Sequence, residues 1–272
     1  MSVGRGPKGK MNAMKWALSV SLSEALANPT LVAEIAAAAE SAGWDGFFVW
    51  DHLWNRTRAP FADPFVTLAA IAVATERLRI GTMVVAVPRR RPQLVAQATT
   101  SLDRLSDGRM VLGVGLGVDS HGEYSAFDEP ANDDRARAAA LDAGLEALVL
   151  MLAGDAVPSA GDRVTTVTGV QAPRVPIWVA GTAGLRAGPR RVARHGLEGL
   201  ALVGADSWTA DRVTEALGAG SLTAGEVDVV LVGGEHPDPG AFEAAGATWC
   251  VPEILPGATA AEAFAAASTS PR

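Results

Sequence analysis

The stretch Gly46–Trp54, GFFVWDHLW, decides the fold of this chain. It is apolar from Phe47 to Trp50 and then presents an acid, Asp51, an imidazole, His52, and a second indole. An apolar run of this length is typical of a strand buried on both faces, as strands of parallel sheets are. Polar residues directly after such a strand lie at its carboxyl end, where parallel α/β folds place their ligand sites. The stretch therefore predicts a parallel α/β fold with a polar site at the strand end.

Similar apolar or β-branched runs alternate with alanine-rich stretches of helical period, which indicates parallel strands joined by helices. The expected strands are Trp16–Val20, Gly46–Trp50, Arg79–Val84, Met110–Val114, Ile177–Ala180, Gly199–Val203, Asp228–Val232 and Thr248–Val251. The expected helices are Thr30–Ala42, Pro64–Thr75, Pro92–Leu105, Asp133–Leu152, Ala183–His195, Ser207–Leu217, Asp238–Ala245 and Ala260–Ala267. Asn28 and Asp63 precede prolines at two helix starts, as N-caps do, and Gly43 and Gly196 provide stops.

Eight strand-helix units in about 255 residues match the size of a (β/α)8 barrel, or TIM barrel. The alternative is an open doubly wound sheet, which would need about six strands and an early glycine fingerprint that VSLSEA, after the first strand, lacks. We therefore expect an α/β TIM barrel in a single domain, residues 14–272, preceded by a disordered lead-in, residues 1–13. The segment Ala153–Arg174 falls outside the alternation and predicts a small extra hairpin, which is an insertion and not a domain.

The composition limits the classes of partner. The chain has 272 residues, of which 49% are hydrophobic, and a formal net charge of -7. Cys250 is the only cysteine, so no intrachain disulfide can form, and we expect a cytoplasmic protein. No basic tract is dense enough to follow a nucleic-acid backbone, and no apolar stretch reaches the ~20 residues needed to cross a bilayer. Because zinc-site spacing, a G-x-S-x-G elbow and a Walker lysine loop are also missing, we expect neither nucleic acid, membrane nor metal as a partner.

Asp51 and His52 are the residues that we expect to carry chemistry. At a strand end of a barrel, His52 could give a proton to a bound substrate or receive one, while Trp50 and Trp54 exclude water. Asp51 would orient the imidazole or contact a ligand. On the residues alone, the alternative is that Asp51 accepts a turn hydrogen bond and His52 is an ordinary loop residue.

Two glycine segments follow later strands. In LGVGLGVD, Leu112–Asp119, the alternate glycines would let the backbone approach a flat ligand, although glycines also relieve crowding in small barrels. In PIWVAGTAGLRAG, the strand runs into Gly181–Gly184 and a helix, whose free amides would bind an anion such as phosphate, with a simple turn as the alternative. Arg186, Arg190 and Arg191, on the following helix, could add positive charge there, with division between solvent and salt bridges as the alternative that their spacing favours. The run Arg89–Arg91 is typical of a solvated turn, but at a site rim it would attract a carboxylate or phosphate tail.

Several segments, in order, carry a resemblance to a known family. They are GWDGFFVWDHLW, DPFVTLAAIAVATERLRIGTMVVAVPRRRP, QATTSLDRLSDGRMVLGVGLG, PIWVAG and GATWCVPE. The chain resembles the bacterial luciferase-like superfamily, including its actinobacterial members that use flavin or the deazaflavin coenzyme F420. The resemblance implies a (β/α)8 barrel that binds an isoalloxazine-type ring at the strand ends. Compared with the longer members, this chain has a shortened insertion region after the fourth helix.

The resemblance also implies roles for single residues. Asp51 and His52 would be catalytic and face the ring, which Trp50 and a bulge at Thr82-Met83, often with a non-prolyl cis peptide, would support. The other cofactor contacts would be Gly115, Leu116, Gly117, Gly181, Thr182, Ala183 and Gly184. We assign the substrate pocket to Trp16, Trp54, Trp178 and Asp119.

The preferred cofactor is F420, with FMN as the alternative. WDHL looks like the F420-using branch, and an arginine rim suits the glutamyl tail of that coenzyme. The carboxylate that some F420 dehydrogenases place after the glycine loop would be Asp119 or Glu123. The implied activity is hydride transfer between the ring and a C=C, C=N or C=O bond of a small molecule. A monooxygenase that uses reduced FMN and a non-catalytic flavin-binding or partner subunit stay open, and the resemblance suggests a homodimer.

Overall fold

The computed structural model describes residues 13–54, 57–159, 162–164 and 167–271. Nearly all of the expected lead-in, residues 1–13, lies outside this part of the chain. Within the described residues, ten strands form one sheet, and eight of these make a ring of parallel neighbours. The ring strands are β1 (Lys15–Val20), β2 (Gly46–Val49), β3 (Arg79–Thr82), β5 (Met110–Gly115), β8 (Ile177–Thr182), β9 (Gly199–Val203), β10 (Asp228–Val232) and β11 (Trp249–Val251). The two added strands are β4 (Val85–Ala86), which pairs with β5, and β12 (Glu253–Ile254), which pairs with β1.

The ring closes where the last ring strand meets the first. β11 pairs in parallel with β1, with Trp16 opposite Cys250 in the register. All the other ring neighbours are parallel as well. The predicted (β/α)8 barrel is therefore confirmed, and the open doubly wound sheet is excluded because that fold has two free edges.

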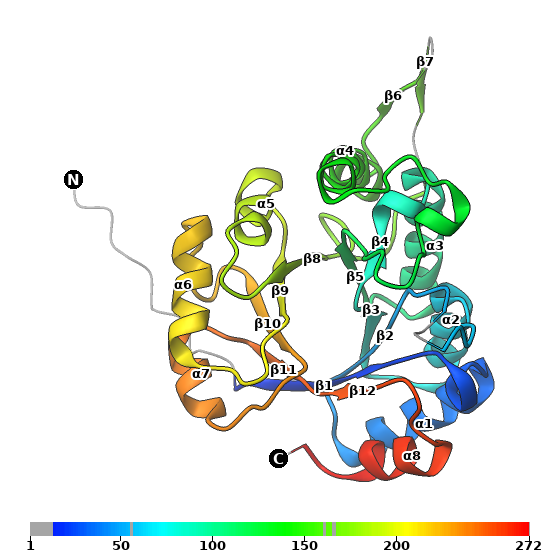
Figure 1. Cartoon of the computed structure of the whole chain (residues 1–272), viewed down its shortest axis with the longest axis vertical. Coiled ribbons are helices and arrows are strands. Elements are labelled where there is room, and N and C mark those ends of the chain that lie inside the picture. The colour runs from blue at the N-terminus through cyan, green and yellow to red at the C-terminus, as the bar shows by residue number, and fades with distance from the viewer. Residues whose placement is uncertain (1–12, 55–56, 160–161, 165–166, 272) are drawn as a thin grey trace.

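Helices surround the ring of strands (Figure 1). The α-helices are α1 (Pro29–Ala42), α2 (Pro64–Ala74), α3 (Pro92–Leu105), α4 (Asp134–Ala153), α5 (Ala187–His195), α6 (Ala210–Gly220), α7 (Pro239–Ala245) and α8 (Ala260–Ser268). Short 3-10 helices are η1 (Glu24–Leu26), η2 (Val87–Arg89) and η3 (Ser125–Phe127). The side chains of Asn28 and Asp63 accept the expected capping bonds, and Gly43 and Gly196 end α1 and α5 in the left-handed conformation. These caps and stops are confirmed.

Two helices begin later than the sequence pattern predicts. The expected helix Ala183–His195 begins at Ala187, because β8 continues to Thr182 and Gly184 then takes a φ of 79°. The expected helix Ser207–Leu217 begins at Ala210, because the side chain of Thr209 caps it by accepting from the N–H of Arg212. In both cases the apolar period starts before the backbone can turn into a helix.

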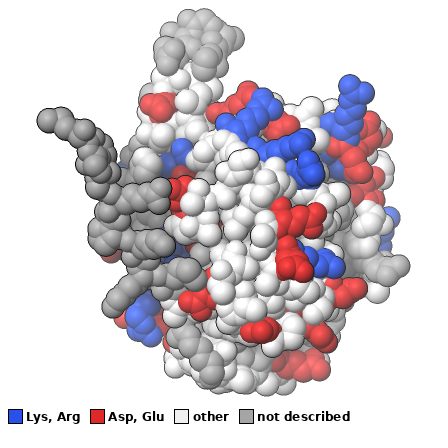
Figure 2. Space-filling view, turned by 90° about the vertical axis from the view of Figure 1, so that its left-hand side faces the viewer, with Lys and Arg blue, Asp and Glu red and all other residues white. Residues whose placement is uncertain are grey.

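The insertion between α4 and β8 contains the predicted hairpin. Its strands β6 (Val157–Ser159) and β7 (Asp162–Val164) are antiparallel, and the hairpin projects beyond α4 in Figure 1. On the face that carries α6, acidic and basic side chains are interspersed with uncharged surface (Figure 2). None of the described helices is long and apolar enough to cross a membrane.

The interior of the barrel is filled by side chains. Alternate residues of the ring strands point inward and form one buried cluster that includes Ala17, Phe48, Trp178, Val230 and Trp249. The residues between them point outward and pack against the helices in two larger clusters. Because the barrel has a packed core and not a pore, a ligand site has to lie at the strand ends, where the loops add polar groups.

Candidate active site

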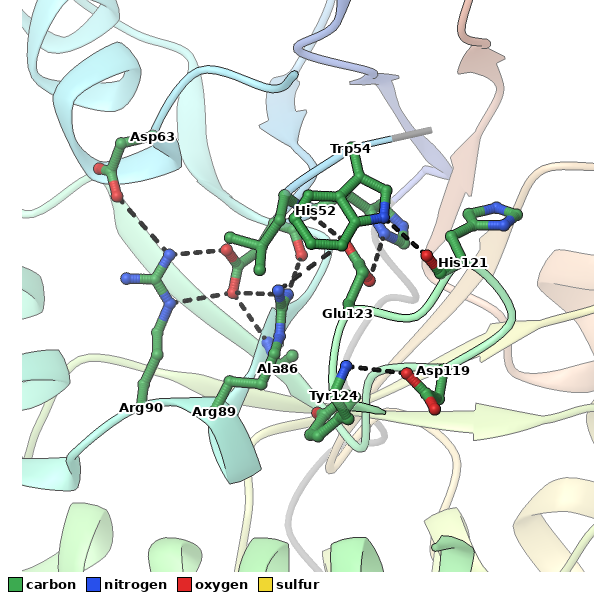
Figure 3. A network of polar contacts seen from close by, with 12 residues as sticks. His52, Trp54, Asp63, Ala86, Arg89, Arg90, Asp119, His121, Glu123 and Tyr124 are labelled. Atoms are coloured by element: carbon green, nitrogen blue, oxygen red, sulfur yellow. Dashed lines mark hydrogen bonds and ion pairs between the residues drawn. The ribbon is translucent and has the colours of Figure 1, made fainter. Parts of the chain in front are cut away.

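A network of buried charges lies at the carboxyl ends of β2 and β3 (Figure 3). Asp51 comes two residues after the end of β2 and is only 4% exposed. Arg90 donates to both of its carboxylate oxygens, from Nη2 to Oδ1 at 2.6 Å and from Nε to Oδ2 at 3.0 Å. The backbone N–H of Ala86 donates to Oδ2 at 3.1 Å, and Nη2 of Arg89 donates to the Asp51 carbonyl oxygen at 2.6 Å. Asp51 therefore anchors the segment after β4 to the end of β2.

Arg90 of this network is held as a cation. Burial alone would lower the pKa of Arg90, but hydrogen bonds and charge from Asp51, with a smaller contribution from Asp63, hold that pKa above its ordinary value. Paired donation from one guanidinium to one carboxylate is among the strong charge-assisted contacts in proteins. The side chains of Arg89 and Arg90 are 6% and 27% exposed, so these two residues face the site, whereas Arg91 is exposed to solvent.

His52 pairs with a carboxylate from a different loop. Its Nδ1 lies 3.0 Å from Oε2 of Glu123, which belongs to the segment between β5 and α4. The side chain of Glu123 is 1% exposed and that of His52 is 28% exposed. Because an ionised carboxylate only accepts hydrogen bonds, Nδ1 donates and carries the proton of the neutral ring. Among the described residues nothing hydrogen-bonds Nε2, so this nitrogen is the one available to a ligand.

Glu123 is fixed in its ionised form. Burial would raise its pKa, but the hydrogen bond and charge of His52, the N–H of Leu53 and the charge of Arg89 hold that pKa below the ordinary value. The Leu53 N–H donates to Oε1 at 2.5 Å, and Nη1 of Arg89 lies 3.8 Å from the same oxygen. The carboxylate therefore connects three segments that are far apart in the sequence.

The partner of His52 differs from the one that the sequence suggested. We expected Asp51 to orient the imidazole or to contact a ligand, but its carboxylate oxygens face Arg90 and Ala86. Neighbouring residues after a strand point in different directions, so adjacency in sequence does not make them partners. Glu123 orients the ring instead.

The loop between β5 and α4 is shaped by hydrogen bonds to its own backbone. Oδ1 of Asp119 accepts from the N–H groups of Tyr124 and Ser125, at 2.8 and 3.1 Å, and these bonds lower the pKa of Asp119. The hydroxyl of Tyr124 donates to the carbonyl of Leu116 at 2.7 Å, and burial raises the pKa of Tyr124 to about 12. Of the two acids considered after the glycine loop, Asp119 thus shapes the loop and Glu123 faces His52.

Two of the predicted indoles lie near His52. The ring centroid of Trp50 lies 5.9 Å from that of His52, and Phe61 lies 5.4 Å from it on another segment. Trp54 donates from Nε1 to the carbonyl of His121 at 2.7 Å and is half-buried. These aromatic groups surround the imidazole with apolar surface while leaving it reachable.

The other two predicted indoles, Trp16 and Trp178, do not lie near His52. Trp16 is near the amino end of β1 and packs against the outer cluster, because Ala17 is the neighbouring residue that faces the barrel interior. Trp178 is 1% exposed inside the barrel, with its ring centroid 5.3 Å from that of Phe48. The predicted pocket residues Trp54 and Asp119 are thus on the loops at the strand ends, and Trp16 and Trp178 are not.

The glycines at the end of β5 and just after it relieve crowding. A Cβ on Gly115 would lie 2.6 Å from a methyl carbon of Val84, and one on Gly117 would lie 2.5 Å from the hydroxyl of Tyr124. Thr82 is buried and donates to the carbonyl of Gly113 at 2.7 Å. Met83 is 7% exposed, and the peptide bond after it, Met83-Val84, is the non-prolyl cis peptide at the bulge to which the resemblance pointed. Leu116 is half-buried in the same loop.

The second glycine segment contains one packed and one open glycine. Gly181 is buried against Gly188 of α5, where a Cβ would meet its Cα at 3.2 Å. Gly184 has a φ of 79° with no atom within 4 Å of a built Cβ, while Thr182 is exposed and Ala183 half-buried beside it. A cavity of about 230 Å³ is lined by residues of this loop and of α6, namely Gly184, Leu185, Arg186, Glu215, Ala216, Gly218 and Ala219.

The sequence pointed to the arginine run and to Glu123, but it did not predict that the arginines pair with Asp51 or that Glu123 pairs with His52. The signal for Glu123 was the family resemblance, in which some members place a carboxylate after the glycine loop, and Asp119 matched that signal equally well. No spacing rule links Glu123 to His52 across 71 residues. Closure of the barrel creates that contact.

Three comparisons with known proteins add to this geometry. The sequence profile described as luciferase-like monooxygenase matches residues 14–245. An F420-dependent glucose-6-phosphate dehydrogenase of Gordonia bronchialis is 33% identical over 163 residues, which cover 56% of this chain and 47% of the relative. A 4-hydroxyprotoasukamycin monooxygenase of Streptomyces nodosus is 35% identical over 109 residues, 38% of this chain and 29% of that protein. The matches thus span about half or less of the length of these curated relatives.

Solved structures share the architecture. The coenzyme F420-dependent tetrahydromethanopterin reductase of Methanopyrus kandleri superposes with a TM-score of 0.72, over 95% of this chain and 98% of that one, at 14% identity. Identity this low supports the fold alone. The sequence profile covers most of the barrel, from the first strand to the end of α7. The chain therefore belongs to the luciferase-like monooxygenase family.

Proposed function

We propose that this protein is an F420-dependent oxidoreductase that moves a hydride between the deazaflavin ring and a C=C, C=N or C=O bond of a small organic molecule. The single observation that carries the proposal is the His52–Glu123 pair, which leaves Nε2 of His52, beside two indoles at the strand ends, without a hydrogen bond to any described residue. Relatives whose names include F420 dependence support the choice of coenzyme.

The residues present fit the phosphate end of such a coenzyme. The start of α5 has no side-chain cap, so backbone N–H groups of its first turn stay available to an anion. Gly184 leaves open space there, and Arg186 lines the adjoining cavity. These two residues and the start of α5 would hold the phosphate, while Trp50 and His52 would lie against the ring. When bound, F420 supplies the hydride donor or acceptor.

The chain itself supplies the proton. Glu123 keeps the proton of the neutral imidazole on Nδ1, so Nε2 of His52 presents its lone pair. Nε2 would take a proton when a substrate hydroxyl or amine is oxidised, and return it when a double bond is reduced. Trp50 and Trp54 would exclude water from this nitrogen.

Titration of the purified protein with F420 and with FMN tests the choice of coenzyme. We expect F420 fluorescence to be quenched at low micromolar concentration and FMN fluorescence to be unaffected in that range. Arg186→Ala should weaken F420 binding about tenfold, because a guanidinium-phosphate contact is lost. Arg190→Ala, an exposed change on the same helix, is the matched control and should leave binding unchanged.

Two outcomes would contradict this assignment. If neither coenzyme binds, the oxidoreductase proposal fails. If FMN binds and F420 does not, the second candidate is favoured, a monooxygenase using reduced FMN, to which the similarity with 4-hydroxyprotoasukamycin monooxygenase points.

For the assembly, we propose a homodimer that buries α2 and the neighbouring α3. The sequence of α2, PFVTLAAIAVA, has no charged residue, yet Val66 and Val73 are 61% and 72% exposed, and Leu94 of α3 is 58% exposed. Apolar side chains gathered on one surface are typical of an interface. Light scattering after gel filtration should give twice the 28.0 kDa of the chain, and Val73→Glu should give the monomer mass. A monomer in the unchanged protein would refute the proposal.

A further inference from the structure

A carboxyl group without a partner lies beside the site, on the strand that follows β11. Glu253 begins β12 and is opposite Ser19 in the parallel register with β1. No described residue forms a hydrogen bond or ion pair with its side chain, which is half-buried. Unlike Asp51 and Glu123, this carboxyl therefore has no structural task in the described part of the chain.

The side chain of Glu253 is on the inward face of the barrel. Val251, two residues earlier, belongs to the interior cluster, and Ile254, the next residue, belongs to an outer cluster. Alternation along the strand puts Glu253 on the same face as Val251. Since Glu253 comes after that residue at the carboxyl end, its carboxyl lies above the packed interior, at the level of the loops that carry the site.

The backbone beside Glu253 makes room for the carboxyl group. A Cβ on Gly233 would lie 2.2 Å from Oε2 of Glu253, so any other residue there would displace the carboxyl. Gly233 also has a φ of 63°, a conformation that favours glycine. The carboxyl group of Glu253 thus lies against the backbone of Gly233, in the loop after β10, where no side chain intervenes.

An indole lies on the other side of Ser19. Trp50 donates from Nε1 to Oγ of Ser19 at 2.8 Å, which holds the N–H edge of its ring at β1, the strand between β2 and β12. Adjacent strands are about 4.8 Å apart, so the ring of Trp50 and the carboxyl of Glu253 flank the same buried serine. A ligand atom above Ser19 could contact both groups.

The charge balance at this end of the barrel favours a cationic ligand. The described arginines of the network, Arg89 and Arg90, are already paired with Asp51, Asp63 and Glu123. Burial raises the pKa of Glu253, because taking a lone carboxylate out of water costs free energy. A bound cation would recover that cost, and a neutral hydroxyl would recover much less of it.

We propose that Glu253 and the indole of Trp50 form a subsite for a positively charged nitrogen of the substrate, an amine or an iminium. The carboxylate pairs with the cation, and the face of the indole stabilises the same charge through its quadrupole. This inference rests on the proposed function, because it places the nitrogen of the substrate at the mouth that would hold the deazaflavin. An iminium carbon is also a hydride acceptor, so the subsite fits the C=N branch of the proposed chemistry.

Two small probes of equal shape test the subsite by calorimetric titration of the F420-loaded protein. Benzylammonium carries the charge, and benzyl alcohol is its neutral counterpart. We expect benzylammonium to bind at least tenfold more tightly than benzyl alcohol to the unchanged protein, and we expect the ratio of the two dissociation constants to fall to about one in Glu253→Gln. Glu235→Gln, an exposed carboxylate after β10, is the matched control and should keep the full preference.

The outcomes separate this inference from the proposed function. The subsite would be overturned by any of three results: equal affinity for both probes, no binding of either probe, or a preference for benzylammonium that survives in Glu253→Gln. The titration is repeated without coenzyme, in case the protein does not bind F420. The proposed function would then fail, but the ratio of the two dissociation constants would still show whether the subsite exists. Glu253→Gln should fold, because it removes an unpaired charge, and its melting temperature at neutral pH should be no lower than that of the unchanged protein.

Discussion

Replacing His52 with alanine is expected to lower kcat for hydride transfer by about 10²- to 10⁴-fold, the usual contribution of a positioned general acid or base. The reason is that Nε2 of His52 has no hydrogen-bond partner in the described part of the chain, while Glu123 holds the ring in place through Nδ1. F420 affinity should fall far less than kcat, because general acid-base catalysis acts on the transition state and the proposed phosphate contacts at Gly184 and Arg186 stay in place. The measurement is the change in F420 absorbance with a substrate found by screening enones, imines and dehydroamino acids.

His121→Ala is the matched control for this experiment. His121 lies in the same network, but it contributes its backbone carbonyl, which accepts from Trp54 (Figure 3). Its ring can therefore be removed without touching that contact, and turnover should be nearly unchanged. Full turnover in His52→Ala would instead support a non-catalytic, ligand-binding role for this chain.

Replacing Asp51 with alanine is expected to cost about 3–5 kcal/mol of folding free energy, the typical effect of removing one partner of a buried ion pair. Arg90 would lose both of its contacts to that carboxylate, and the N–H of Ala86 would lose its acceptor. The side chain of Asp51 is 1% exposed, so water cannot readily replace it. Urea unfolding followed by circular dichroism measures the change.

A surface pair provides the comparison for Asp51. Arg194 and Glu146 form an ion pair at 3.1 Å with side chains 61% and 59% exposed. Exposed pairs contribute little, so Glu146→Ala should change the unfolding free energy by less than about 1 kcal/mol. If Asp51→Ala cost no more than this surface variant, the network at the strand ends would not be an anchor.

The barrel could be predicted from the sequence because each strand-helix unit has its own local pattern of apolar residues. Gly199–Val203 and Asp228–Val232 have the predicted bounds, and so does α3. The late start of α5 was missed because apolar period cannot distinguish a turn at Gly184 from a first helical turn. Short β12 was missed because two residues carry no pattern at all.

The site was predicted less completely, and the reason is physical. His52 and Trp54 lie on the loop where the strand pattern put them. Trp16 and Trp178 were placed by residue type alone, and the alternation of the strands directs them outward and into the packed interior. The pairing of His52 with Glu123 depends on how two loops meet above the barrel, which neither loop encodes by itself.

The position of Glu123 has a consequence for building chimaeras within the family. Loops at the strand ends of a barrel are often treated as modules that can be exchanged while the scaffold is kept. Here the segment after β5 supplies the acceptor for both the imidazole of His52 and the backbone of Leu53. A transplanted segment without a carboxylate at that point would leave Nδ1 of His52 and the N–H of Leu53 without their acceptor, so these two loops form one transferable unit and have to be exchanged together.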